Sequence, residues 1–405
     1  MKKIISDPQA VQKVIESFSR TTDQIYTLEE LKKALLSGKQ LRMKYGVDVT
    51  APHMHIGHAV NLWMYRKLQE LGHKIVFLIG DFTTQIGDPT GKSKTRPIIP
   101  ESEIKKNAQE FIKQAMMVLI DDPHLVEVRR NSEWFSKMNT KEFLSLLSVV
   151  THEKLMSRDM FRKRMEEGRE IYMHEITYPI LQGYDSVMLE ADITIIGTDQ
   201  LYNEMMGRFY QERYEQNPQI IITTKITPGI DGGEKQSKSL GNYIGLGHSP
   251  REKFGRVMSM ADNLITQYLE VYTEVALAEI EDIKKHLASD PMKYKLMLAH
   301  EIVARYHGKV SADEELSWFK KTFSEREIPN DAPQVSLGGA TASVFQIVKK
   351  CFGEDKSNTE IKRLIEQKAV RIGGELAKGP DESFSVPKKG LPVKIGKRNW
   401  FKIFP

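Results

Sequence analysis

Three histidines lie within six positions in the segment PHMHIGHAV, residues 52–60. His53, His55 and His58 could ligate a metal, act as general bases, contact a nucleotide or simply pack at a turn. One metal shared by all three would need a sharp turn, because His53 and His55 alternate in a segment expected to be extended. No cysteine lies nearby and few carboxylates do, so the pattern favours a nucleotide contact over a metal site.

A second candidate segment is QIGDPTGKSKTRP, residues 85–97. A Walker loop requires four residues between its first glycine and the Gly-Lys pair, whereas three separate Gly87 from Gly91. The spacing therefore excludes a Walker loop. Asp88 could bind a small cationic group at the end of a strand, or it could be an ordinary turn aspartate before Pro89.

A third candidate is the polar loop GGEKQSKSLGN, residues 232–242. Lys235 and Lys238 are accompanied by two serines and flanking glycines. A cationic loop of this kind can close over a triphosphate and stabilise charge that develops in the transition state. By itself, the same composition is also typical of a solvated loop.

The elements that would position these segments form an α/β pattern. A helical stretch is expected at about 8–38. A strand in 41–52, a helix ending near Gly72 and a continuous apolar strand at 74–82 then form a parallel crossover unit. Further strands are expected at 125–130, 192–197 and 219–224. In a parallel sheet, ligands lie beyond the carboxyl ends of the strands, where His55 and His58 would also meet a helix N-terminus.

The domain pattern changes along the chain. We expect a Rossmann-type catalytic domain over 1–232 with a helical insertion at about 115–190, and a loop with an α-helical domain over 233–325. A linker at 326–342 and a small α+β domain at 343–405 complete the chain.

Composition is that of an ordinary globular protein, with 40% hydrophobic and 28% charged residues and a net charge of +5. No apolar run approaches a membrane span and the start lacks a signal core, so we expect no membrane association and a cytoplasmic location. The single cysteine, Cys351, excludes an intrachain disulfide. The basic segment 386–401 permits RNA contact without requiring it.

Taken together, HIGH at 55–58 and KQSKS at 235–239 resemble the paired signatures of class I aminoacyl-tRNA synthetases, with Gln236 in place of the usual methionine. The segments that resemble bacterial-type tyrosyl-tRNA synthetases are ITYPILQGYDSV (176–187), IIGTDQLYN (195–203), FLIGDFTTQIGDPTGKS (77–93) and KIGKRNWFKI (394–403). The last domain resembles an S-four-type RNA-binding module through SNTEIKRLIEQKAVRIGGE.

The resemblance implies a tyrosine–tRNA ligase. ATP, as its magnesium complex, would activate tyrosine to tyrosyl-adenylate with release of pyrophosphate, and the tyrosyl group would pass to the 3′ end of tRNA. Attack by a carboxylate needs no general base, so positioning and charge stabilisation suffice. No tightly bound cofactor and no metal site are expected.

Residue roles follow from the resemblance. His55 and His58 would contact the phosphates, and Lys235 and Lys238 would meet the pyrophosphate. The residues implied to bind ATP are Asp48, Gly57, Gly197, Asp199, Ser237 and Ser239. The residues implied to bind tyrosine are Asp88, Tyr178, Gln182, Asp185 and Gln200. Among these, Asp88, Tyr178 and Gln182 would surround the amino group. Asp185 would accept a hydrogen bond from the phenolic hydroxyl and so exclude phenylalanine.

Three positions depart from the family pattern. Lys44 stands where some members have a tyrosine that contacts the phenol, and the neighbouring Tyr45 should point to the opposite face of its strand. The sequence DVT at 48–50 replaces Asp-Pro-Thr. Ile196 stands where a glycine is common near the adenosine.

The implied partners are tyrosine, its tRNA and a second copy of the chain, with the helical insertion at the dimer interface. Candidate RNA contacts are Lys362, Arg363, Arg371, Lys394, Lys397 and Arg398. Two alternatives stay open at this point. One is a synthetase-like RNA-binding protein without ligase activity, and the other is a small nucleotidyltransferase that uses HIGH alone.

Overall fold

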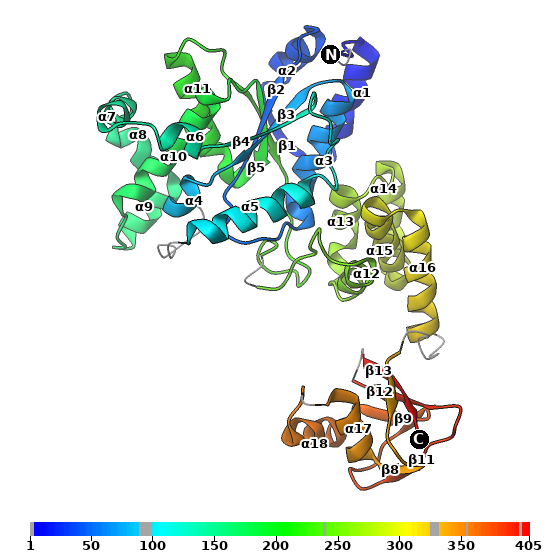
Figure 1. Cartoon of the computed structure of the whole chain (residues 1–405). Coiled ribbons are helices and arrows are strands. Elements are labelled where there is room, and N and C mark those ends of the chain that lie inside the picture. The colour runs from blue at the N-terminus through cyan, green and yellow to red at the C-terminus, as the bar shows by residue number, and fades with distance from the viewer. Residues whose placement is uncertain (1–3, 89–98, 238–239, 325–331, 354, 397–398) are drawn as a thin grey trace. The chain divides into compact units, whose positions relative to one another are not determined.

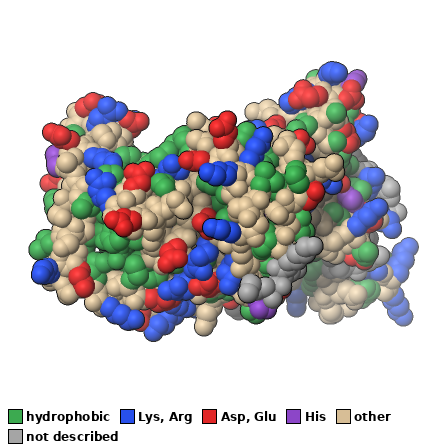
Figure 2. All heavy atoms as spheres, turned by 90° about the horizontal axis from the view of Figure 1, so that it is seen from above, with side chains coloured by type: hydrophobic (Ala, Val, Ile, Leu, Met, Phe, Trp, Pro, Cys, Tyr) green, Lys and Arg blue, Asp and Glu red, His purple; other side chains and the backbone are tan. Residues whose placement is uncertain are grey.

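The computed structural model describes residues 4–88, 99–237, 240–324, 332–353, 355–396 and 399–405. The chain divides into two compact units, 1–312 and 313–405. Across the described ranges, no helix combines the length and the apolarity needed to cross a bilayer. Figure 2 shows Lys and Arg mixed with Asp and Glu over the face that it draws, so positive charge does not form one continuous patch there.

The first unit is built on a six-stranded sheet with the order β1-β6-β5-β2-β3-β4. The strands are β1 (Thr22–Tyr26), β2 (Arg42–Val47), β3 (Lys74–Ile79), β4 (Val126–Arg130), β5 (Ile193–Gly197) and β6 (Ile220–Thr224). All neighbours are parallel except β1, which runs antiparallel to β6. The five parallel strands confirm the predicted α/β class.

Strand β1 corrects the prediction of a continuous helical opening over 8–38. Two helices, α1 (Pro8–Phe18) and α2 (Leu28–Leu36), flank it instead. The strand is five residues long, mixes polar and apolar side chains and pairs on one side, at the edge of the sheet. An edge strand of this kind lacks the continuous apolar run that identifies a strand buried on both faces.

The order of the strands creates a switch point at β2. Its neighbours are β3 on one side and β5 on the other. The chain passes from β2 to β3 and β4 on one side, and then returns to β5 and β6 on the other. Ligands in open parallel sheets bind beyond the carboxyl ends of strands at such a point. Asp48 follows β2 directly and Thr198 follows β5 directly, which places both at this edge.

Helices cover both faces of the sheet, with α10 and α11 on one side and α1 and α3 on the other (Figure 1). The bounds of the remaining helices before β5 are α3 (Ile56–Glu70), α4 (Thr83–Ile86), α5 (Glu101–Ala115), α6 (Ser132–Phe135), α7 (Thr140–Leu147), α8 (His152–Met156), α9 (Asp159–Glu166) and α10 (Met173–Met188). After β5 come the 3₁₀ turn η1 (Thr198–Gln200) and α11 (Leu201–Arg213). Helices α6 to α10 lie between β4 and β5, within the stretch of about 115–190 that was expected to be a helical insertion.

Helices α10 and α11 pack closely because two glycines remove side chains at their crossing. A Cβ at Gly183 would lie 2.9 Å from the Met206 backbone. A Cβ at Gly207 would lie 2.5 Å from Gln219 Nε2 and 2.7 Å from Ser186 Oγ. These approaches are shorter than ordinary van der Waals contact, so glycine is required at both positions for the polar groups between the helices to meet.

The helical part that follows β6 contains α12 (Pro250–Met258), η2 (Asp262–Leu264), α13 (Ile265–Tyr272), α14 (Leu277–His286), α15 (Pro291–His307), α16 (Lys309–Phe319) and the π-helical turn η3 (Lys320–Ser324). Apolar positions at helical spacing bury Ile265, Tyr268 and Leu269 on α13, and Leu298 and Ile302 on α15. The predicted helical character of this stretch is confirmed.

The second unit contains a five-stranded sheet with the order β10-β9-β12-β13-β7 and a two-stranded sheet β11-β8. Its elements are β7 (Gln334–Ser336), β8 (Thr341–Ser343), α17 (Val344–Phe352), α18 (Asn358–Glu366), β9 (Val370–Ile372), β10 (Glu375–Leu376), β11 (Ser383–Ser385), β12 (Leu391–Ile395) and β13 (Asn399–Phe404). Strand β7 lies inside the segment 326–342 that was expected to be a linker. It is part of the sheet because it pairs in parallel with β13.

Candidate active site

His55 and His58, the two histidines of the HIGH segment, lie at the N-terminus of α3. His55 is the N-cap residue, and its backbone N–H donates to His58 Nδ1 at 3.2 Å. Because Nδ1 of His58 is an acceptor, its Nε2 carries the proton of the neutral ring. The two ring centroids are 3.8 Å apart. The helix N-terminus and an N–H donor thus lie together where an anion would be stabilised.

Gly57 makes room for this arrangement. A Cβ at this position would lie 2.8 Å from His55 Nδ1 and 2.9 Å from its Cε1. Any side chain would therefore displace the His55 ring. The predicted contact between Gly57 and adenine stays a prediction.

The segment after the KQSKS loop lies directly beside the HIGH segment. Ile56 N–H donates to Ile244 O and Leu246 N–H donates to Met54 O, both at 2.9 Å. Gln236 is 6% exposed, donates from Nε2 to Tyr272 Oη at 2.8 Å and accepts from Ile244 N–H at 3.2 Å. The structure therefore brings the two predicted motifs together, and it gives the family departure at Gln236 a structural role.

Lys235 forms an ion pair with Asp199, with Nζ 2.7 Å from Oδ2. Asp199 belongs to the turn after β5, and a Cβ at Gly197 would lie 2.7 Å from its Oδ1. Ser237 N–H donates to Asn242 Oδ1 at 2.8 Å. Lys238 and Ser239 lie outside the described residues.

Asp48 lies next to Tyr178. Its Oδ2 accepts from Tyr178 Oη at 3.0 Å and its Oδ1 accepts from Thr83 Oγ1 at 2.9 Å. A Cβ at Gly80 would lie 2.5 Å from Asp48 Oδ1, so glycine is needed after β3. Burial and the Asp48 carboxylate raise the pKa of Tyr178 well above its usual range. Asp48 was assigned to the nucleotide, yet its described contacts are with a residue assigned to tyrosine.

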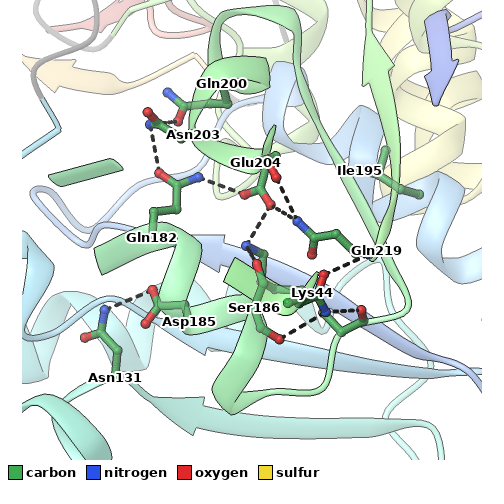
Figure 3. A network of polar contacts seen from close by, with 12 residues as sticks. Lys44, Asn131, Gln182, Asp185, Ser186, Ile195, Gln200, Asn203, Glu204 and Gln219 are labelled. Carbon is green, nitrogen blue, oxygen red and sulfur yellow. Dashed lines mark hydrogen bonds and ion pairs between the residues drawn. The ribbon is translucent and has the colours of Figure 1, made fainter. Parts of the chain in front are cut away.

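A continuous series of hydrogen bonds connects Asp88 to Glu204 through three amide side chains, which we call the amide chain. Figure 3 shows the part of it from Gln200 to Glu204. Gln200 Nε2 donates to Asp88 Oδ2 at 2.8 Å. Asn203 Nδ2 donates to Gln200 Oε1 and to Gln182 Oε1, both at 2.9 Å. Gln182 Nε2 donates to Glu204 Oε1 at 2.8 Å. The predicted tyrosine-binding residues Asp88, Gln182 and Gln200 are thereby brought into one network.

Asp185 is buried, 4% exposed, one helical turn from Gln182. Its Oδ1 accepts from Trp134 Nε1 at 3.0 Å and its Oδ2 from Asn131 Nδ2 at 3.4 Å. Burial raises the pKa of Asp185 to about 8, and the charge of Lys44 opposes that rise. A carboxyl group held in this way can take part in a hydrogen bond with a hydroxyl of a bound molecule.

The departure at Lys44 on β2 is explained by a buried ion pair. Lys44 is 2% exposed and its Nζ lies 2.7 Å from Glu204 Oε2, while Tyr45 packs its ring against Tyr65 and Phe77. The prediction that Tyr45 points away from Lys44 is confirmed. Ile196 is buried within β5.

Several residues of this site were not identified from the sequence. They come from several separate segments: Thr83, Asn131, Trp134, Arg158, Asn203 and Glu204. Arg158 is 6% exposed; burial lowers its pKa and the Asp88 carboxylate opposes that. The available signals were that Thr83 and Asn203 belong to the segments 77–93 and 195–203, and that Glu204 directly follows the second segment.

The candidate RNA contacts fall into a row and a helix. Arg371 on β9 is paired with Lys394 on β12, which is paired with Trp400 on β13. Lys394 Nζ lies 4.8 Å from the Trp400 ring centroid. Lys362 and Arg363 are exposed on α18. Lys397 and Arg398 lie outside the described residues, and Trp400 was missed.

Metal-binding residues were sought over the described ranges, and no group of three or more His, Cys, Asp or Glu side chains there could hold a metal ion. His53 is exposed, and it lies near His248, whose pKa burial lowers to about 4.

Known proteins resemble this chain over most of its length. The family described as tRNA synthetases class I (W and Y) matches residues 36–324. The tyrosine–tRNA ligase of Carboxydothermus hydrogenoformans is 42% identical over 383 residues, which cover 93% of each chain. That of Aquifex aeolicus is 40% identical over 382 residues, covering 94% of this chain and 96% of the other.

Solved structures share the fold. The C-terminally truncated mitochondrial tyrosyl-tRNA synthetase of Aspergillus nidulans matches with a TM-score of 0.64 and 24% identity, covering 78% of this chain and 98% of its own. The tyrosyl-tRNA synthetase of Archaeoglobus fulgidus, complexed with L-tyrosine, matches with a TM-score of 0.58 and 19% identity, covering 76% and 99%. At these identities the likeness shows a shared fold and nothing more.

Proposed function

Because this chain belongs to the class I tRNA synthetases for tryptophan and tyrosine, we propose that the residues gathered at the carboxyl ends of β2, β3 and β5 are its active site. Its reaction is the ligation of tyrosine to tRNA, since relatives about 40% identical over most of the chain are tyrosine–tRNA ligases. The predicted alternative, an RNA-binding protein without ligase activity, is not favoured.

Tyrosine would lie between the amide chain and Asp185. Its ammonium group would meet the Asp88 carboxylate, Tyr178 Oη and Gln182 Oε1, which are negative or electron-rich. Its phenol would reach Asp185, held by Trp134 and Asn131. A substrate without the hydroxyl would leave part of the hydrogen-bonding capacity of this buried carboxyl group unsatisfied, which disfavours phenylalanine.

ATP would lie along the HIGH segment, where the α3 N-terminus and His58 Nε2–H face its phosphates. Lys235 and Lys238 would bind the β- and γ-phosphates. The Lys235–Asp199 ion pair would have to open or be shared when ATP enters, which frees Asp199 for the ribose. Magnesium, entering with ATP, would neutralise part of the phosphate charge.

In the first step, a tyrosine carboxylate oxygen attacks the α-phosphorus, the new O–P bond forms, and the bond to pyrophosphate breaks. Charge increases on the phosphate oxygens in the transition state, where His55, His58 and the lysines stabilise it without a proton transfer. In the second step, a hydroxyl of the tRNA 3′ end attacks the tyrosyl carbonyl, and AMP leaves.

The basic last unit would bind tRNA. Arg371, Lys394 and Trp400 lie across three adjacent strands, and such a row of cations and an aromatic ring suits phosphate contact and base stacking. The helical stretch 250–325 would add contacts to tRNA.

The cytoplasm is the proposed location of the protein.

A homodimer is also proposed, with the helical insertion at the interface. Supporting this, the insertion exposes large apolar side chains, with Leu144 at 58%, Met165 at 49% and Met173 at 74%. Exposed apolar groups on one segment are typical of association surfaces. Sedimentation of Met173→Asp against the unmodified chain tests the interface, and an unchanged dimer would reject it.

The observation that carries the assignment of the site is the amide chain, which unites Asp88, Gln200 and Gln182 beside Tyr178 and Asp185. The test is ATP–pyrophosphate exchange with each amino acid in turn, for the unmodified chain and for Asp88→Asn. We expect tyrosine alone to support exchange and Asp88→Asn to raise the KM for tyrosine. An unchanged KM would remove Asp88 from the site.

A further inference from the structure

A buried ion pair lies behind the proposed tyrosine pocket, between β2 and α11 (Figure 3). Lys44 Nζ and Glu204 Oε2 are 2.7 Å apart, and both side chains are 2% exposed. Lys44 also donates to Ser186 Oγ at 2.7 Å, and Glu204 Oε2 accepts from Gln219 Nε2 at 2.7 Å. Each buried charge is therefore compensated, and removing one would leave the other unpaired in the interior.

Glu204 determines which way the neighbouring amide faces. An ionised carboxylate only accepts hydrogen bonds, so the NH₂ group of Gln182 must face Glu204 Oε1, and Gln182 Oε1 must face away from it. Asn203 Nδ2 donates to one lone pair of Gln182 Oε1 at 2.9 Å. A carbonyl oxygen has a second lone pair, which can accept from a bound molecule.

The same rule extends along the amide chain. Asn203 Nδ2 approaches the carbonyl oxygens of both Gln182 and Gln200, so the NH₂ group of Gln200 faces Asp88. The chain begins at one carboxylate and ends at another. Its amides are thus oriented by chemistry at both ends, with the Lys44–Glu204 pair fixing the end that lies deepest.

We propose that the Lys44–Glu204 pair is a positioning device that holds the Gln182 carbonyl oxygen toward the ammonium group of the amino-acid substrate. This inference rests on the proposed function, in which Gln182 contacts that group. In the opposite orientation Gln182 would present N–H donors to a cation, which is repulsive. The Lys44 ammonium group, 2.7 Å away, balances the charge of Glu204 at this buried position.

The test replaces Glu204 by glutamine, which keeps the shape but allows either end of the Gln182 amide to face it. We expect the KM for tyrosine in ATP–pyrophosphate exchange to rise roughly tenfold to a hundredfold, with kcat and the KM for ATP within about threefold. The matched control is Glu175→Gln on the same helix as Gln182. Glu175 forms a comparable ion pair with Arg164, 2.7 Å apart and 6% exposed on each side, outside the amide chain.

Two analogues separate positioning from a general loss of structure. Tyramine retains the amino group and lacks the carboxylate, whereas 3-(4-hydroxyphenyl)propionate lacks the amino group. Glu204→Gln should weaken inhibition by tyramine about as much as it raises the KM for tyrosine. It should leave inhibition by the propionate unchanged, because that molecule offers Gln182 no ammonium group.

The inference is overturned if Glu204→Gln leaves the KM for tyrosine unchanged, if Glu175→Gln raises it equally, or if both analogues weaken together. Should Glu204→Gln not fold, the double variant Lys44→Met with Glu204→Gln removes both charges, leaves no unpaired ion and carries the same expectation. A different result would contradict the proposed function itself. If the unmodified chain bound the propionate as tightly as tyrosine, the pocket would not contact the amino group.

Discussion

The backbone N–H of Ile56 donates to the carbonyl oxygen of Ile244 at 2.9 Å, and this bond joins two motifs that are far apart in the sequence. Ile56 opens α3 directly after His55, and Ile244 follows the KQSKS loop. With the Leu246–Met54 bond beside it, the end of the loop is fixed to the helix N-terminus by the main chain. The end of the loop that carries Lys235 is therefore placed relative to His55 by main-chain groups that no side-chain substitution removes.

Replacing Lys235 by alanine should slow activation without weakening tyrosine binding. Lys235 is assigned to the leaving pyrophosphate, so its charge acts mainly in the transition state. We expect kcat for pyrophosphate exchange to fall by roughly 10²–10³-fold, with the KM for tyrosine within about threefold. Lys225→Ala is the control, because Lys225 forms an ion pair of the same length with Glu270. A rise in the KM for tyrosine as large as the fall in kcat would contradict the assigned role.

Gln236→Leu should disturb the loop through its buried contacts. The change removes the acceptor for Ile244 N–H and the donor to Tyr272 Oη, two bonds that hold the residue next to Lys235. We expect about a tenfold lower kcat for exchange, since misplacing a charged group by even ~1 Å can cost that much or more. Tyr272→Phe removes one of the two bonds and should cost less. A normal kcat for Gln236→Leu would show that the loop is positioned without this side chain.

The sequence was sufficient for the elements that follow a simple period. The strand Lys74–Ile79 is a continuous apolar run buried on both faces, and the helix after His55 shows regular spacing, so both were predicted. The short edge strand Thr22–Tyr26 was missed, because its partner lies about 200 residues away and its composition is mixed.

The site divides in the same way. Motif residues such as His55 and Asp185 could be assigned because their segments resemble a family. The partner of Lys44 could not, since Glu204 is 160 residues away and carries no pattern of its own. A buried lysine in an apolar strand indicates that a carboxylate must exist, but only the close crossing of α10 and α11 identifies which one.

Asp185→Ala should relax selection against phenylalanine. The Asp185 carboxyl group, fixed by Trp134 and Asn131, is the group that the phenolic hydroxyl would satisfy. Trp134 and Asn131 then lose their acceptor with either substrate, and the missing hydroxyl of phenylalanine no longer costs a hydrogen bond to Asp185, so the ratio of kcat/KM for tyrosine over phenylalanine should fall by at least about 100-fold. Exchange assays with both amino acids measure this ratio. An unchanged ratio would place the hydroxyl elsewhere.

The ionisation of Asp185 should make stability fall as the pH rises. Burial raises its pKa to about 8 in the folded chain, above the ordinary value of 3.8. Below pH 4 both states hold the proton, whereas between about pH 4 and 8 the unfolded chain loses it first, so the free energy of unfolding decreases and then levels off.

Asp185→Asn cannot ionise and should lack this decrease. Denaturant unfolding of both proteins at pH 5, 7 and 9 measures the difference, which we expect to change by on the order of 1–5 kcal/mol in favour of the asparagine variant as the pH rises. The asparagine oxygen can still accept from Trp134, whereas its NH₂ group cannot accept from Asn131. That loss is the same at every pH, so the change of the difference with pH reports the charge. If the two proteins keep the same difference at every pH, Asp185 is ionised in the folded chain at neutral pH, and the bound hydroxyl then donates to a carboxylate.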